Sequence, residues 1–155
     1  MNRESDFVLD AEGLTKIYGS GHTEVVAVKD VSIQINRGQI AAMLGPSGAG
    51  KSTLLTMLGL IRPPSAGVIA INNTVVYQDN RLKVNVRDFR RKNLGFVFQK
   101  ANLIPFLTAM ENVSLAMEID DVPAAKARRR AIKLLEYLDV HKRADNLPNT
   151  LSGGE

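Results

Sequence analysis

The stretch that decides the fold is GPSGAGKST, Gly45 to Thr53, which follows the apolar run QIAAMLG and opens the helical pattern KSTLLTMLGLI. It fits G-x-x-x-x-G-K-[ST], with glycines at the two ends of the loop and Lys51 and Ser52 after them. Glycines let backbone N–H groups converge on a polyphosphate, and the helix that begins near Gly50 adds the positive end of its dipole. The stretch therefore predicts a phosphate-binding loop.

Two side chains of this loop have predicted roles of their own. Lys51 brings a positive charge to the β- and γ-phosphates, and the Ser52 hydroxyl can ligate Mg²⁺. The predicted cofactor-binding set of the loop is Gly45, Pro46, Ser47, Gly48, Ala49, Gly50, Lys51, Ser52 and Thr53. The alternative is an ordinary glycine turn between a strand and a helix, for which a chance match in a chain of this length is on the order of one percent.

The residues before the loop predict β structure. Residues 7–19 and 23–36 are rich in Val and Ile at alternating positions, and the turn string GSGH separates them, so we expect an antiparallel pair. The run QIAAMLG at 39–45 is short, apolar and bounded by glycine, which is typical of a buried strand.

The residues after the loop alternate in type. Residues 51–61 predict a helix that ends at RPPSAG, because proline cannot continue it. GVIAIN at 67–72 and LGFVFQ at 94–99 predict further strands. Helical spacing begins at about Thr108, and we expect helices over 108–119 and 123–140.

Composition excludes several classes of protein. A chain of 155 residues with no cysteine predicts one domain without a disulfide framework or a thiolate metal site. Its N-terminus lacks the apolar run of a signal peptide, and no stretch is long and apolar enough for a membrane span. The net charge of +4 comes largely from residues 81–93 and 126–133, which we interpret as solvated helix faces because no aromatic residues interleave to stack bases.

Two other stretches narrow the class of P-loop protein. Gln99 closes an apolar run, and a glutamine at the end of a strand can reach the crevice where open α/β sheets bind ligands; the alternative is a polar surface residue. LSGGE, Leu151 to Glu155, offers a hydroxyl and close-approach glycines at what we interpret as the beginning of a helix. Taken alone, such a string is also common in turns and linkers.

Taken in order, these stretches resemble the nucleotide-binding subunit of an ABC transporter over almost the whole chain. GPSGAGKST is similar to the Walker A loop of that family, and Tyr18 resembles its aromatic residue that stacks on adenine, although an ordinary tyrosine at a strand end is the alternative. Gln99 resembles the Q-loop glutamine that contacts Mg²⁺ and the attacking water. The resemblance therefore assigns Lys51 and Gln99 to catalysis, and Ser52 and Gln99 to the metal. The signature sequence is matched by Leu151, Ser152, Gly153, Gly154 and Glu155.

The resemblance implies a fold and a set of partners. We expect an α/β P-loop NTPase with a RecA-like core, an N-terminal antiparallel β subdomain and core over about 1–100, and a helical subdomain over about 101–155. ATP and Mg²⁺ are the implied cofactors. The implied partners are a second ATP-binding domain, paired head to tail so that each signature serves the other domain's ATP, and membrane permease subunits, with no nucleic acid. The implied location is cytoplasmic, on the inner face of the cell membrane.

The 155 residues stop at the signature. The family's Walker B strand, catalytic glutamate and switch histidine would follow it, so we expect a single truncated domain that lacks the C-terminal part of the core and binds nucleotide without turning it over. FQKANLIPFLTAMENV (98–113) and a signature that ends in Glu155 resemble the lipoprotein-releasing and macrolide-efflux type of exporter ATPase. Two alternatives stay open: a soluble ABC-type protein that contacts nucleic acid or ribosomes through Arg128–Arg130, and a non-catalytic nucleotide-binding remnant.

Overall fold

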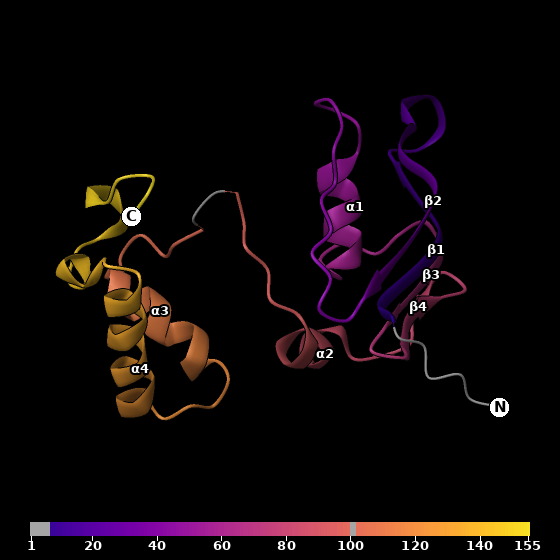
Figure 1. Cartoon of the computed structure of the whole chain (residues 1–155). Helices are drawn as coiled ribbons and strands as arrows, with labels where there is room; N and C mark the ends of the chain where they lie inside the picture. Colours follow the sequence, from indigo (N-terminus) through magenta and orange to yellow (C-terminus); the bar gives the residue numbers. More distant parts are fainter. Residues whose placement is uncertain (1–6, 100–101) are drawn as a thin grey trace. The chain divides into compact units, whose positions relative to one another are not determined.

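The computed structural model describes residues 7–99 and 102–155, and the chain divides into two compact units, Met1–Phe96 and Val97–Glu155 (Figure 1). The subdomain boundary predicted near residues 100–101 lies outside the described residues. Within the described ranges, no helix is long and apolar enough to cross a membrane.

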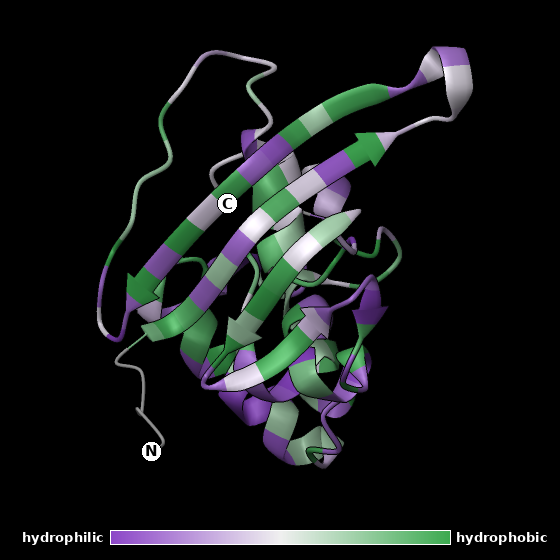
Figure 2. Cartoon of the chain, turned by 90° about the vertical axis from the view of Figure 1, so that its right-hand side faces the viewer, coloured by the Kyte–Doolittle hydropathy of each residue, from purple (hydrophilic) through white to green (hydrophobic). Residues whose placement is uncertain are grey.

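The first unit is built on an antiparallel sheet with the strand order β2-β1-β3-β4-β5. The predicted antiparallel pair is confirmed, with Leu9 opposite Ile35 and Tyr18 opposite Val25. Figure 2 shows hydrophobic and hydrophilic residues alternating along the strands, as expected for a sheet that buries one face. The strands are β1 (Phe7–Tyr18), β2 (Val25–Asn36), β3 (Ala66–Ile71), β4 (Thr74–Gln78) and β5 (Arg81–Leu82).

The core of the first unit lies between this sheet and helix α1 (Lys51–Leu58). Leu14 of β1, Met57 of α1 and Ile69 of β3 are fully buried in it. The predicted helix after the glycine loop and the predicted strand near residue 67 are both confirmed. Packing of α1 on the sheet fixes the place of the loop that precedes it.

Strands β4 and β5 were not predicted. Asn72 and Asn73 join β3 to β4 with φ values of 48° and 61°, and Asp79 and Asn80 join β4 to β5 with φ of 55° each. Two positive φ values in succession are the mark of the two-residue hairpin turn that matches strand twist, and Asn and Asp tolerate it. Helix α2 (Val86–Asn93) follows, and the side chain of Asn85 caps it by accepting a hydrogen bond from the Asp88 amide at 3.3 Å.

Two predicted strands are wrong. Residues 39–45 and 94–99 run as irregular chain, and neither pairs with a strand of the sheet in the described part of the protein. A strand needs a neighbour to satisfy its backbone N–H and C=O groups, and an apolar run alone does not supply one. Ile40 and Leu44 are accordingly 97% and 91% exposed.

The second unit is helical, as predicted. Helices α3 (Ala109–Glu118) and α4 (Ala124–Tyr137) pack through Met110, Ala131 and Leu135, and Pro123 is the residue directly before α4. Two short 3₁₀ turns, η2 (His141–Arg143) and η3 (Pro148–Thr150), lead to LSGGE. LSGGE itself forms a turn, in which the Glu155 amide donates to the Ser152 carbonyl at 3.1 Å; the interpretation of this stretch as the beginning of a helix stays a prediction.

Candidate functional site

The predicted phosphate loop is a cradle of glycines at the beginning of α1. Gly45, Gly48 and Gly50 have φ of 151°, 81° and 81°, a region that residues with a Cβ rarely adopt. Gly50 is the N-cap of α1, and its carbonyl accepts the first intrahelical bond from Leu54 at 2.8 Å. The N–H groups of the first three helical residues, Lys51, Ser52 and Thr53, have no partner within the helix and are available to an anion.

Gly50 also fits against β2. A Cβ at position 50 would overlap the carbonyl oxygen of Ala27 and press on the side chain of Val28. The absence of a side chain therefore lets the loop sit directly on the strand. This contact connects the loop to the sheet independently of α1.

The loop lines a pocket of about 570 Å³ together with the first three residues of β2. Its size is within the range of small-ligand sites. Ser52 is exposed in this pocket. Most of the residues that line the pocket have small side chains or none. The lining residues are Val25, Val26, Ala27, Ser47, Gly48, Ala49, Gly50, Lys51, Ser52 and Thr53.

Lys51 is folded back over the loop. Its Nζ donates to the carbonyl oxygens of Gly45 at 2.7 Å and Pro46 at 2.5 Å. These acceptors are neutral, and an ammonium makes stronger hydrogen bonds to phosphate oxygens than to carbonyls. The side chain is thus held beside the pocket by bonds that an anion can replace.

Tyr18 lies at the end of β1, opposite Val25, which lines the pocket. Tyr18 itself is not among the lining residues. Two cations contact its ring: Lys16 Nζ is 5.3 Å and Arg62 Cζ 5.8 Å from the ring centroid. Contacts of this kind attract a cation to the face of an aromatic ring, and sequence reasoning did not anticipate them.

The donor set suits a metal that is held mainly by phosphate oxygens. Among the described residues, no group of three or more His, Asp or Glu side chains could hold a metal ion. Mg²⁺ commonly keeps one or two protein ligands and completes its shell with substrate phosphates and water, so the Ser52 hydroxyl fits that chemistry. Gln99, the other predicted metal ligand, is exposed and belongs to the second unit.

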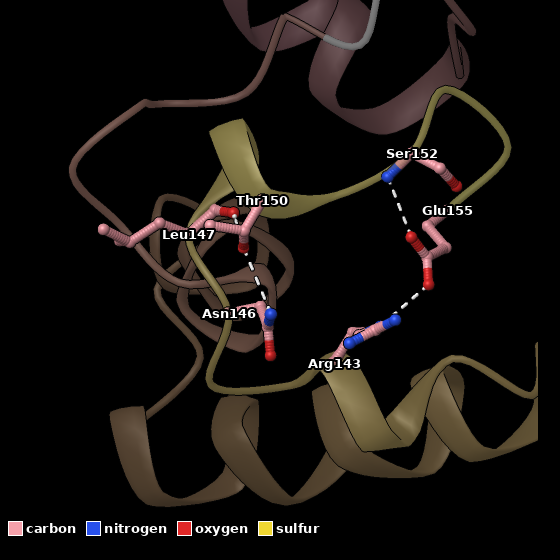
Figure 3. Close-up of polar contacts among 6 residues, drawn as sticks. All are labelled: Arg143, Asn146, Leu147, Thr150, Ser152 and Glu155. Atoms are coloured by element: carbon pink, nitrogen blue, oxygen red, sulfur yellow. Dashed lines mark hydrogen bonds and ion pairs between the residues drawn. The ribbon is translucent and has the colours of Figure 1, made fainter.

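The signature turn, Leu151–Glu155, is closed by the carboxylate of its last residue (Figure 3). Glu155 Oε2 accepts a hydrogen bond from the Ser152 amide at 2.8 Å, and Glu155 Oε1 accepts one from Arg143 Nε at 2.8 Å. The Ser152 amide, and after it the Arg143 guanidinium, lower the pKa of Glu155 from 4.5 to about 2. The carboxylate is therefore ionised at neutral pH.

Nothing in their own unit requires residues 153 and 154 to be glycine. A Cβ on either would meet open space, and neither has a φ in the left-handed region. Gly50, by contrast, is required by both its φ and its contact with Ala27. What two adjacent open glycines permit is the close approach of atoms from another molecule.

Sequence reasoning missed Asn112 and Arg143. The Asn112 amide nitrogen donates to the carbonyls of Ile104, Leu107 and Thr108 at 3.2, 2.9 and 3.0 Å, and its oxygen accepts from the Ile104 amide at 2.7 Å. Asn112 thus fastens the segment 104–108 to α3. A polar residue that favours turns over helices, placed inside a helical pattern, is the signal that could have identified it.

Comparison with known proteins gives the family. Residues 28–155 match the family described as ABC transporter. The chain is 41% identical to a lipoprotein-releasing system ATP-binding protein of Bacteroides thetaiotaomicron over 96% of its length, and 40% identical to a methionine import ATP-binding protein of Streptococcus agalactiae over all of it. The predicted resemblance to subunits of the lipoprotein-releasing type is confirmed.

A solved structure has the same fold. A dimeric, post-hydrolysis form of the ATP-binding cassette MJ0796, bound to ADP and phosphate, matches with a TM-score of 0.83 at 34% identity, over 94% of this chain and 63% of that one. The chain spans about 65% of the length of the Bacteroides relative. With most of its residues matched by the family model and a like fold over 94% of its length, the chain belongs to the ABC transporter family of ATP-binding domains.

Proposed function

We propose that this chain is the ATP-binding part of an ABC transporter, which couples ATP binding and hydrolysis to transport by membrane subunits. The observation that carries the proposal is the pocket of about 570 Å³ at the beginning of α1, lined by Ser47 to Thr53. Backbone N–H groups, a helix N-terminus and a lysine ammonium converge there, and together they are suited to a polyphosphate.

The loop residues have separate roles in this proposal. Glycines 45, 48 and 50 shape the backbone around the phosphates, Lys51 exchanges its loop carbonyls for β- and γ-phosphate oxygens, and Ser52 provides a ligand for Mg²⁺. When bound, Mg²⁺ neutralises charge on the phosphates. Tyr18 stacks on the adenine ring, and its neighbour Val25 in the pocket wall is the observation that supports this role.

The signature turn serves the ATP of a second domain. Gly153 and Gly154 are open to approach from outside and are not required by their own unit. The related cassette MJ0796 is described as dimeric. We propose that this chain also pairs with a second ATP-binding domain, in a head-to-tail arrangement. The P-loop unit and the helical unit are in this proposal the two parts of one ABC-type domain. Gln99 is proposed as a residue that would help to hold Mg²⁺ and the attacking water, and its resemblance to the family's Q-loop glutamine supports this role.

The segment after Gln99 is the proposed contact with a membrane subunit. Leu103 and Phe106 expose 39% and 77% of their surface, while Asn112 holds the backbone beside them. A fixed backbone with exposed apolar side chains is suited to docking a helix of a permease at the inner face of the membrane. Relatives named for lipoprotein release and for methionine import are similarly close, so the shared part is the ATP-binding part and not the substrate site.

A phosphate ladder tests the proposal. Binding of fluorescent AMP, ADP and ATP to the chain, with Mg²⁺, should strengthen with each added phosphate, because the site is built to hold phosphates. Equal affinity for AMP and ATP would argue for a base-binding site elsewhere.

Sedimentation of the chain with and without MgATP tests the pairing of two ATP-binding domains. The proposal expects a larger species only with nucleotide.

A second candidate function is supported by one face of α4. Lys126, Arg129, Arg130 and Lys133, at helical spacing, line a pocket of about 340 Å³. A soluble ABC-type protein acting on nucleic acid or ribosomes would use such a face on a phosphate backbone. RNA binding that weakens steeply with salt, and that is lost on replacing Arg129 and Arg130 with glutamate, would favour this candidate over a transporter subunit. ATP binding without either partner would favour a non-catalytic remnant.

A further inference from the structure

We propose that Arg143 is a positioning residue for the signature turn and acts on it through Glu155. The proposal rests on the proposed function in one respect, namely that the open glycines of the turn face a phosphate. It assigns to Arg143 two effects: the guanidinium fixes the Glu155 side chain that closes the turn, and it neutralises the carboxylate that lies beside the phosphate-facing backbone.

The first effect follows from how Glu155 uses its two oxygens. One oxygen holds the Ser152 amide and the other holds Arg143 Nε, each at 2.8 Å. The Glu155 amide returns a bond to the Ser152 carbonyl at 3.1 Å. Glu155 therefore bonds to both the amide and the carbonyl of Ser152, and Arg143 holds the Glu155 side chain.

Arg143 is itself held from α3. Its amide donates to the Val140 carbonyl at 2.9 Å, and its carbonyl accepts from the Asn146 amide at 2.9 Å. The carbonyls of Ala144 and Asn146 accept from the first two amides of α3, both at 2.9 Å, which are donors that a helix cannot satisfy internally. The N-terminus of α3 thus fixes the backbone around Arg143, and Arg143 in turn fixes the Glu155 side chain of the signature turn.

The chemistry of position 155 requires a carboxylate for this arrangement. Glutamine has one acceptor oxygen, and its amide nitrogen can only donate. With glutamine at 155, an NH₂ group replaces one of the two oxygens, so the Ser152 amide and Arg143 would no longer each have an acceptor oxygen of their own. Glutamine at this position cannot make the same two-oxygen bridge, so the link between Arg143 and Glu155 depends on the carboxylate.

The second effect follows from charge. An ionised carboxylate next to a turn that receives a phosphate repels it, unless a cation compensates. The Arg143 guanidinium is in contact with Glu155 and compensates its charge. Because the side chains of Arg143 and Glu155 remain 50% and 27% exposed, the pair contributes little to global stability, and its influence is local.

The structural arm of the test uses NMR on the full 155-residue chain without nucleotide. In the wild type, the Glu155 carboxyl should titrate with a pKa of about 2. Arg143→Ala should raise that pKa and speed the hydrogen exchange of the Ser152 amide several-fold, and Arg143→Lys should restore much of both. The matched control is Lys142→Ala, which removes an exposed cation from the same 3₁₀ turn and should change neither.

The functional arm measures MgATP-dependent association of the chain by sedimentation. Arg143→Ala should weaken association more than Glu155→Gln, because only Arg143→Ala leaves an uncompensated carboxylate. The double variant Arg143→Ala/Glu155→Gln should associate better than Arg143→Ala alone. A residue with only a structural role would not produce this reversal, because removing a second contact would then weaken association further.

The outcomes separate this inference from the proposed function. A Glu155 pKa near its ordinary value in the wild type, or one that does not change in Arg143→Ala, overturns the role of Arg143 whatever the nucleotide does. A double variant that is weaker than Arg143→Ala overturns the charge effect. Failure of the wild type to associate with MgATP, with the titrations as expected, overturns the head-to-tail pairing and the phosphate-facing role while the Arg143–Glu155 link stands.

Discussion

Gly50 lies against the carbonyl oxygen of Ala27 so closely that a Cβ at position 50 would overlap it. This contact joins the N-cap of α1 to strand β2, and residues of both elements line the pocket at the beginning of α1. The glycine is therefore required twice, once by its φ of 81° and once by the strand beside it. The geometry of the loop depends on the sheet as much as on the helix.

Gly50→Ala should abolish nucleotide binding and lower the melting temperature. The left-handed backbone costs about 1–2 kcal/mol with a Cβ, and relief of the overlap with Ala27 forces the loop off the strand. The matched control is Gly38→Ala, since Gly38 has a similar φ of 76° but open space around it. Thermal unfolding and ATP titration of both variants check this; equal effects on binding would contradict the role of the Ala27 contact.

Thr108→Ala should destabilise α3 by about 1 kcal/mol, the usual cost of losing an N-cap. Its hydroxyl accepts from the Glu111 amide at 3.2 Å, and the Glu111 carboxylate accepts from the Thr108 amide at 2.8 Å. Thr108→Ser keeps the hydroxyl and should retain most of the stability. Urea unfolding followed by circular dichroism measures both variants, and the cap is refuted if they lose stability equally.

The hydrogen bond from the Ser152 amide to Glu155, which closes the signature turn, should be kept at neutral pH and lost in acid. The pKa of Glu155 is lowered from 4.5 to about 2, so the folded turn favours the ionised carboxylate. A group of this kind contributes stability that is fully present above its unfolded pKa and is lost as pH falls through its folded pKa. The exchange-corrected protection of the Ser152 amide should therefore hold from pH 7 down to about 4.5 and then fall toward pH 2. Loss of protection already between pH 7 and 5 would contradict the bridge.

Amides of residues 40–45 should exchange faster than those of β1. The segment has no strand pairing in the described structure, and Ile40 and Leu44 are exposed, whereas β1 is bonded to β2 and β3 on its two sides. Exchange follows local opening, so unpaired backbone is the least protected. Mass spectrometry of peptides from a timed exchange measures this, and equal protection of the two segments would show that residues 40–45 form a paired strand in solution.

Local sequence patterns were sufficient to predict helices, whose hydrogen bonds are internal, and strands that pair with the next strand in the sequence. β1 and β2 alternate and are adjacent in sequence, and α1, α3 and α4 have helical spacing, so each was identified. Residues 39–45 and 94–99 have equally apolar sequences, but a strand also needs a neighbour, and no local pattern contains that information. The hairpins at Asn72 and Asp79 could have been identified from their Asn- and Asp-containing turns.

The candidate site divides in the same way. The loop from Gly45 to Thr53 is contiguous, so its motif could be recognised without the fold. The contacts Gly50–Ala27 and Arg143–Glu155 join residues 23 and 12 positions apart, and only folding brings them together. Of the two cations beside Tyr18, Arg62 comes from the chain after α1, so only folding brings it to the ring.

The central claim is that the Gly45–Thr53 loop binds the phosphates of ATP. Isothermal titration of the chain with MgATP, beside Lys51→Ala and the exposed-lysine control Lys92→Ala, tests it most directly. We predict saturable binding with one site per chain, a loss of at least about tenfold in affinity for Lys51→Ala, equivalent to about 1.4 kcal/mol, and no change for Lys92→Ala. Binding that is equally strong in Lys51→Ala, or absent from a folded wild type, would contradict the claim.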